Sequence, residues 1–236
     1  MRKQLLLSFF IVISLVAYTQ ERILWDYPIK PGTDEWAAFK TGEQMVNACQ
    51  IPLEILRTLT TKELVEISLN YPLFNNYMAF NDERKGVNSI ITRFNGLREL
   101  SQRADCVNEL IQAYVNFPII TQIPKDPNSK FYHTPFKLPF LELVLSDNLF
   151  LSQLNSEDLE VIRKIAINKY ALKIENPEVY SFHNIRTTML LAAMIIDKQN
   201  KTTNSQEEKE IISGFIKNYN QSVPELLTAI SKIIIK

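Results

Sequence analysis

Apolar residues recur three and four positions apart along most of this chain of 236 residues. Val87, Ile90, Ile91 and Phe94 give a clear example, because this spacing places all four on one face of a helix. No two segments alternate between apolar and polar residues convincingly enough to pair as strands. The pattern therefore predicts an all-α protein.

Polar caps and prolines divide this pattern into separate helices. Thr60 and Glu63 stand in capping-box spacing, which predicts a helix over 61–70. We expect Pro139 to open another helix and Ser156 to cap the next one. Further helices are expected over 35–49, 73–80, 83–93, 97–117, 180–197, 207–219 and 224–235.

These segments add up to about nine to eleven helices, which predicts an irregular multi-helix bundle or a HEAT-like α-α stack. No fixed repeat emerges, so a regular solenoid is not supported. The helix over 180–197 is apolar on all sides between 189 and 196, and we expect it at the centre of the C-terminal half. We expect one helical domain over 34–236, in which two packed halves meet at a proline-rich loop over 118–135.

The first nineteen residues have the layout of a secretory signal peptide. Arg2 and Lys3 precede an uncharged apolar run from Leu5 to Ala17, and the small residue Thr19 follows. The run is too short to span a bilayer comfortably, although an uncleaved N-terminal anchor remains an alternative. The sequence thus predicts an exported protein with a signal peptide over 1–19, followed by an irregular arm over 20–33.

The charge balance excludes several classes of partner. The chain has 26 Lys and Arg against 26 Asp and Glu, and loss of residues 1–19 would bring the net charge to about −2. Nucleic-acid binding needs clustered positive charge, which this chain lacks. No segment after residue 19 is apolar enough to cross a membrane, so we expect no transmembrane segment in the mature chain.

The only two cysteines, Cys49 and Cys106, leave two states open. An oxidising compartment permits a disulfide between them. Free cysteines, however, commonly pack in a core as small apolar side chains. Sequence spacing alone does not decide between the bridge and two buried thiols.

Aromatic residues occur at every third position from 71 to 80, and amides and charges stand beside them. On one or two helical turns the rings would share a broad face, which could bind a sugar or a peptide while the polar groups orient it. The alternative is that the rings belong to the core. The candidate ligand-binding residues are Tyr71, Phe74, Tyr77, Asp82 and Arg84.

Catalytic signatures are missing from the chain. The two histidines, His133 and His183, stand in no H-E-x-x-H pattern, so the sequence predicts no metal site and no cofactor. There is no G-x-S-x-G, S-x-x-K or P-loop motif. A hydrolase whose carboxylates lie far apart in sequence nevertheless stays open.

Several phrases of the sequence resemble a group of uncharacterised exported proteins of Bacteroidetes. They are WDYPIKPG at 25–32, CQIP at 49–52, NYPLFNNYMAFNDERKG at 70–86 and LPFL at 138–141. The resemblance implies export from a Gram-negative cell, hence the periplasm or the cell surface. It implies no activity and no site residues.

Two hypotheses of function follow from these observations. The first is a non-catalytic exported protein that binds another envelope or secreted protein. The second is a ligand-binding or glycan-binding protein, or a hydrolase with dispersed residues, which uses a cleft near 71–84 or between the two halves. The loop over 118–135 could bind a partner, although its composition favours a connector that covers apolar surface.

Overall fold

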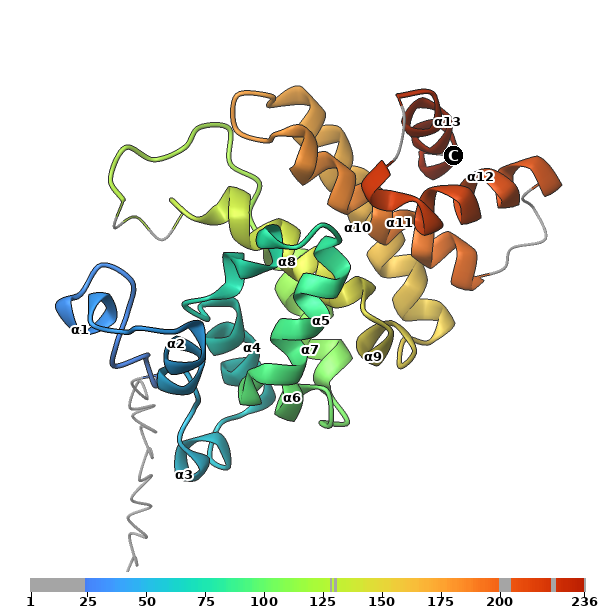
Figure 1. Cartoon of the computed structure of the whole chain (residues 1–236). Helices are drawn as coiled ribbons and strands as arrows, with labels where there is room; N and C mark the ends of the chain where they lie inside the picture. The colour runs from blue at the N-terminus through green and yellow to red at the C-terminus, as the bar shows by residue number, and fades with distance from the viewer. Residues whose placement is uncertain (1–23, 128, 130, 200–204, 222–223, 236) are drawn as a thin grey trace, which may run out of the picture.

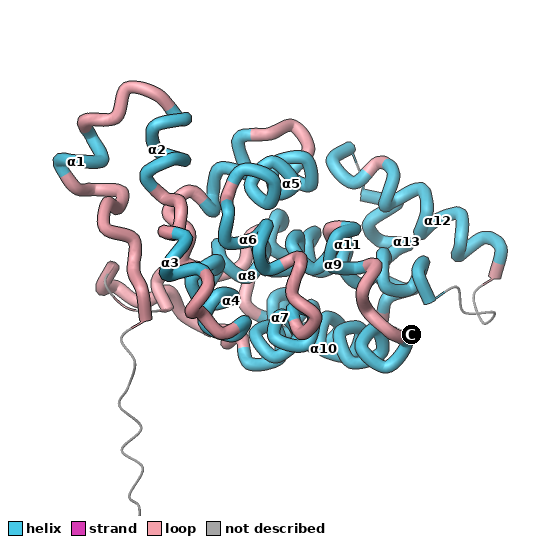
Figure 2. The backbone as a smooth tube through the Cα atoms, turned by 90° about the horizontal axis from the view of Figure 1, so that it is seen from below, coloured by secondary structure: helices cyan, strands magenta, loops and turns pink. Residues whose placement is uncertain are grey.

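The computed structural model describes residues 24–235 apart from 128, 130, 200–204 and 222–223 (Figure 1). The expected signal peptide over 1–19 lies outside these residues. Within them the chain forms helices joined by loops, without strands, as Figure 2 shows in a view from below. The prediction of an all-α, multi-helix fold is confirmed.

The described part of the chain contains thirteen α-helices and two short 3-10 helices, and nine of the α-helices have seven residues or more. They are α1 (Asp34–Ala37), α2 (Gly42–Ala48), α3 (Leu53–Leu56), α4 (Thr61–Leu69), the 3-10 helix η1 (Phe74–Ala79), α5 (Glu83–Arg93), α6 (Asn95–Leu100), α7 (Cys106–Asn116), α8 (Thr134–Ser146), α9 (Asn148–Leu151), α10 (Ser156–Glu175), α11 (Phe182–Gln199), α12 (Gln206–Lys217), the 3-10 helix η2 (Tyr219–Gln221) and α13 (Pro224–Ile234). In this part of the chain no helix is long and apolar enough to cross a membrane.

Helices α8 and α11 form the middle of the molecule (Figure 1). Helix α8 packs against α4, α5, α7, α9 and η1, and it also packs against α11. Helix α11 in turn contacts α10, α12 and α13, as expected for a segment that is apolar on all sides. One cluster of buried apolar side chains extends from Tyr27 to Ile234.

Local signals set several helix boundaries as the sequence predicts. The Thr60 hydroxyl accepts from the Glu63 amide while the Glu63 carboxylate accepts from the Thr60 amide, so the capping box opens α4. Helix α5 covers the expected range of 83–93. It approaches η1 so closely that a Cβ on Gly86 would lie 2.5 Å from the carbonyl oxygen of Tyr77, and glycine is therefore required there.

The prediction of a single helix over 35–49 is wrong, because the structure has two helices there. Helix α1 ends after one turn, and Thr41 starts α2 through a second capping box with Gln44. Gly42, which lies in the middle of the expected helix, is instead the first residue of α2. The cap overrides the apolar period, because it satisfies amide groups that a new helix start exposes.

Pro139 does not open a helix, as the sequence analysis expected, but lies inside α8. The helix begins at Thr134, and the proline near its start is Pro135. Pro139 has no N–H to donate to the carbonyl of Pro135, which would otherwise be left without a partner. The Asn184 side chain of α11 donates to that carbonyl instead. A long-range contact thus compensates for the helix-interior proline.

Two smaller boundaries also differ from expectation. Helix α10 is capped by Asn155 rather than Ser156, in a capping box with Asp158. The helix expected from residue 97 begins at Asn95 as α6, and the Asn95 side chain bonds both the amide and the carbonyl of Ile51. This residue ties the start of α6 to the loop before α3.

Cys49 and Cys106 are free, buried thiols, so the bridge that the sequence left open is not formed in the structure. Each thiol has its own surroundings. Cys49 ends α2 near Tyr27 and Tyr71, and burial raises the pKa of its thiol to about 11. Cys106 begins α7 and donates to Oε1 of Gln153 at 3.3 Å.

Candidate binding groove

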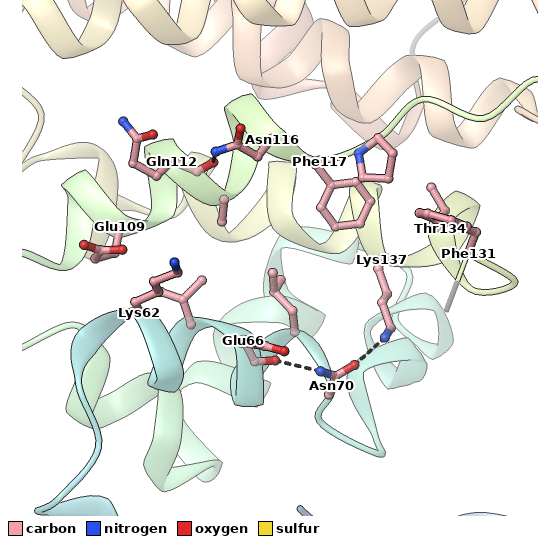
Figure 3. Close-up of a pocket in the computed structure, with 14 residues that line it drawn as sticks. Lys62, Glu66, Asn70, Glu109, Gln112, Asn116, Phe117, Phe131, Thr134 and Lys137 are labelled. Atoms are coloured by element: carbon pink, nitrogen blue, oxygen red, sulfur yellow. Dashed lines mark hydrogen bonds between the residues drawn. The ribbon is translucent and has the colours of Figure 1, made fainter. Parts of the chain in front are cut away.

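A pocket of about 1050 Å³ lies where α4 and α7 face each other below the loop that precedes α8 (Figure 3). Its apolar lining comes from Val65, Leu69, Ala113, Phe117, Pro118 and Phe131. Its polar lining comes from Lys62, Glu66, Asn70, Glu109, Gln112, Asn116, Thr134 and Lys137. The pocket thus combines apolar surface with amides and charges of both signs.

A second pocket of about 750 Å³ adjoins the first, because Asn70 and Lys137 line both. The irregular segment over 24–31 forms one wall of it, and the start of η1 with the residues before it forms another. Trp25, Tyr71 and Phe74 contribute aromatic surface, and His133 stands at the α8 end. We call the two pockets together the binding groove.

Helical spacing explains why so many polar side chains reach the groove. Lys62, Glu66 and Asn70 follow one another at four-residue intervals along α4 and the residue after it, so they form one row. Gln112 and Asn116 form a similar row on the facing side of α7. Figure 3 shows these two rows on opposite sides of the pocket.

Lys137 stands at the junction of the two pockets, in the first turns of α8. Its ammonium donates to the side-chain oxygen of Asn70, and the Asn70 amide donates to the carbonyl oxygen of Glu66 at 3.0 Å (Figure 3). Lys137 forms no ion pair with any described carboxylate. Burial lowers the pKa of Lys137, and the nearby charge of Glu66 opposes this effect.

His133 lies one helical turn before Lys137 and faces the second pocket. Burial lowers the pKa of its imidazole, and the charge of Lys137 lowers it further. Its ring meets the edge of Tyr132, with centroids 5.2 Å apart. The imidazole therefore favours its neutral form beside the lysine.

The residues proposed from the sequence as a ligand site do not come together. Tyr71 and Phe74 line the second pocket, although both rings are mostly buried, and Tyr71 stacks on Phe94 with centroids 4.2 Å apart. Tyr77 is fully buried and stacks on Phe140. Phe80, the fourth ring of the run, is 43% exposed and lies at a separate small hollow.

Asp82 and Arg84 lie outside the groove and pair with each other. Arg84 Nη2 is 2.9 Å from Asp82 Oδ2, and Arg84 Nη1 donates to the carbonyl oxygen of Ile216 at 2.7 Å. Burial alone would raise the pKa of Asp82, but its hydrogen bonds and ion pair with Arg84 lower that pKa overall. These two residues thus fasten α5 to the end of α12.

A cluster of hydrogen-bonded groups surrounds Glu83, next to this pair. His183 Nδ1 is 2.9 Å and Arg186 Nη2 is 3.1 Å from Glu83 Oε1, and the Tyr219 hydroxyl donates to Glu83 Oε2 at 2.9 Å. The Tyr77 hydroxyl lies 3.2 Å from His183 Nε2. The order Glu83, His183, Tyr77 is that of a proton relay, but burial of the Tyr77 hydroxyl keeps it from a substrate and raises its pKa. The cluster therefore joins α5 to α11 and η2 without forming a reaction centre at Tyr77.

The sequence analysis named Tyr71 and Phe74 as candidate ligand-binding residues and favoured a connector for the loop over 118–135, and residues of each line the two pockets. It did not name Lys137. The sequence does contain one sign of the groove, namely the polar residues at four-residue intervals along α4 and α7. Such rows are ordinary on exposed helices, so only the facing arrangement of α4 and α7 gives them meaning. Lys137 carried no sequence signal of its own.

No family model, no curated protein and no solved structure matches this chain. Among the described residues, no group of three or more His, Cys, Asp and Glu side chains could hold a metal ion. The functional argument therefore depends on the geometry of the groove.

Proposed function

We propose that this is an exported binding protein whose groove receives an extended peptide segment of another envelope or secreted protein. The observation that carries the proposal is that the two pockets adjoin at Asn70 and Lys137, which line both of them. An extended chain advances about 3.3 Å per residue, so a short segment would be long enough to enter both pockets.

The lining supports a peptide as the occupant. Phe117, Phe131 and Trp25 offer apolar and aromatic surface for side chains. Gln112 extends from α7 at the rim. Within the described part of the chain its side-chain carboxamide makes no hydrogen bond. A carboxamide both donates and accepts, so it can bond the backbone of an extended peptide.

Glycoside hydrolysis is a second candidate, because Glu66 and Glu109 line the first pocket from facing helices. A glycosidase needs two carboxyl groups on either side of the bond that it cleaves. One of the two must act as an acid, which normally requires burial in apolar surroundings. Glu66 is exposed and Glu109 is only partly buried, so neither carboxyl group has the enclosed apolar surroundings of such an acid, and the geometry favours binding over hydrolysis.

A random peptide library displayed to the purified protein tests the proposed function. Ala113→Phe fills the first pocket from α7, whereas Val115→Phe places the same ring at an exposed position of that helix outside the groove. We expect selected peptides to bind the wild type and Val115→Phe equally and Ala113→Phe at least about tenfold more weakly.

A second blocking variant protects this test against a folding defect. Gln112 is exposed, so Gln112→Trp obstructs the rim without disturbing the core. The proposal would be wrong if no peptide is enriched, or if the selected peptides bind both blocked variants as well as the wild type. Turnover of oligosaccharides that disappears in Glu66→Gln and Glu109→Gln would favour the hydrolase instead.

We also propose that the protein reaches the periplasm or the cell surface through a signal peptide over 1–19. The basic start and the short apolar run support this proposal. Mass spectrometry of the protein isolated from its own cell envelope should find an N-terminus at residue 20. An intact Met1 in a membrane fraction would support the uncleaved anchor.

A further inference from the structure

We infer that the groove selects peptides in which an acidic side chain stands between apolar ones, and that this side chain pairs with Lys137. The inference depends on the proposed peptide-binding function and names the chemistry of its ligand. It follows from where the positive charge stands within the groove and from what that charge contacts.

Lys137 is the charged side chain that both pockets share. Figure 3 shows its ammonium directed toward Asn70, which follows the end of α4. A neutral amide oxygen is its hydrogen-bond acceptor, so its positive charge lacks a direct counter-ion within the described chain. A half-buried ammonium with a neutral partner gains more from an arriving carboxylate than an exposed ammonium does, because solvent screens the new pair less.

The other charges of the groove do not offer the same opportunity. Lys30 in the second pocket already pairs with Asp26. Lys62 is an exposed lysine of α4 at the first pocket, where solvent screens its charge. The carboxylates of Glu66 and Glu109 repel an anion within the first pocket. Glu66 also acts on Lys137 through its charge, but the two side chains form no ion pair, so the ammonium keeps its bonding capacity for a ligand. The junction at Lys137 is therefore the most favourable place for one carboxylate.

The position of Lys137 also predicts where the acid lies along the ligand. Apolar and aromatic surface continues on both sides of the junction, toward Phe117 in the first pocket and toward Trp25 in the second. A chain that passes through both pockets places its middle at Lys137 and its flanking side chains on these surfaces. An acidic side chain within the peptide fits this arrangement better than a terminal carboxylate, at which the chain would end.

Capped fluorescent peptides test this inference. The first probe has a central glutamate flanked by leucine and phenylalanine, with an acetylated N-terminus and an amidated C-terminus. The second replaces the glutamate with glutamine, and the third keeps the glutamine but has a free C-terminal carboxylate. We expect the wild type to bind the glutamate probe about tenfold more tightly than the capped glutamine probe in fluorescence polarisation.

Lys137→Met keeps the apolar stem but removes the charge, so it should bind the glutamate and glutamine probes equally. Lys85→Met is the matched control, because it removes the charge of an exposed lysine on α5 outside the groove. It should retain the tenfold preference. Added salt should reduce the preference of the wild type and leave Lys137→Met unaffected.

The outcomes separate this inference from the function on which it depends. If the two capped probes bind equally and Ala113→Phe weakens both, the groove binds peptides and the acidic preference is wrong. If only the probe with a free carboxylate binds, the groove recognises the terminal carboxylate, and the inference of an internal acidic side chain is wrong. If no probe binds the wild type and the peptide library enriches nothing, the proposed function itself fails.

Discussion

At the scale of single residues, the most demanding feature is a buried ion pair between α8 and α10. Lys173 and Glu142 are both fully buried, and Lys173 Nζ lies 2.9 Å from each carboxylate oxygen. Thr187 donates to the same carboxylate at 2.7 Å and the Tyr114 hydroxyl donates to it at 3.2 Å. The network satisfies a charge that α8 would otherwise bury alone, at a cost of several kcal/mol.

Lys173→Met should therefore destabilise the protein by about 3–5 kcal/mol, because it leaves the Glu142 carboxylate buried without its cation. Urea unfolding monitored by circular dichroism measures the loss. Lys164→Met is the control, since Lys164 is 70% exposed and its ammonium is 3.9 Å from Glu160. That exposed pair should contribute less than about 1 kcal/mol. Equal effects of the two substitutions would contradict the role of the buried pair.

Lys169, one turn before Lys173, gives a prediction on the alkaline side. Burial lowers the pKa of its ammonium to about 8, with Glu142 opposing the effect and Lys173 adding to it. A lysine of the unfolded chain has a pKa of about 10.4. Between the folded and the unfolded pKa the unfolded chain binds more protons than the folded protein, so the free energy of unfolding rises with pH. From about pH 7 to about pH 9.5 the wild type should gain stability relative to Lys169→Met. A constant difference between the two in urea unfolding would contradict this.

At the scale of helices, short signals predicted some starts and ends well and missed others for a physical reason. Thr60 and Glu63 carry the capping box of α4 within four residues, so the sequence alone was enough. Pro139 looked like a helix start because its compensation comes from Asn184, 45 residues later in the chain. A helix boundary that depends on a contact with a distant residue cannot be predicted from the local sequence pattern.

The central position of α11 leads to a prediction for that helix. Leu191 is fully buried, and α11 packs on α8, α10, α12 and α13. Leu191→Ala should cost about 2–5 kcal/mol, because the lost transfer energy and the remaining cavity add together. Leu172→Ala on α10 is the matched control, since Leu172 is 42% exposed. In thermal unfolding, a loss at Leu191 no greater than that at Leu172 would place α11 at the periphery.

At the scale of the whole molecule, the groove shows why the site was harder to predict than the fold. Helical period predicted all-α packing, because the period is local to each segment. The groove needs α4, α7, α8 and the arm over 24–31 to converge, and no local pattern specifies which helices face one another. Tyr71, Phe74 and the loop over 118–135 were nevertheless noticed in the sequence, because rings and prolines stand out even without a fold, and residues of each line the two pockets.

The cluster around Glu83 holds distant parts of the chain together and predicts how the whole molecule responds to acid. Burial alone would raise the pKa of Glu83, but the hydrogen bond and charge of His183, the charge of Arg186 and the Tyr219 hydroxyl lower it overall. A carboxyl group whose folded pKa is depressed stabilises the protein above its unfolded pKa, near about 4.3, and loses that contribution as the pH falls through the folded value.

Wild-type stability should thus decline from about pH 5 downward, and Glu83→Gln should be less stable at neutral pH with a shallower decline. Asp82, whose pKa is also lowered, keeps part of the acid response in the variant. Urea unfolding at a series of pH values compares the two slopes, with Glu207→Gln as the control because Glu207 lies on the exposed face of α12. Parallel curves for the wild type and Glu83→Gln would show that this cluster does not couple α5 to α11 and η2. A shallower slope in Glu83→Gln alone would show that proton uptake at Glu83 weakens the contact of α5 with α11 and η2.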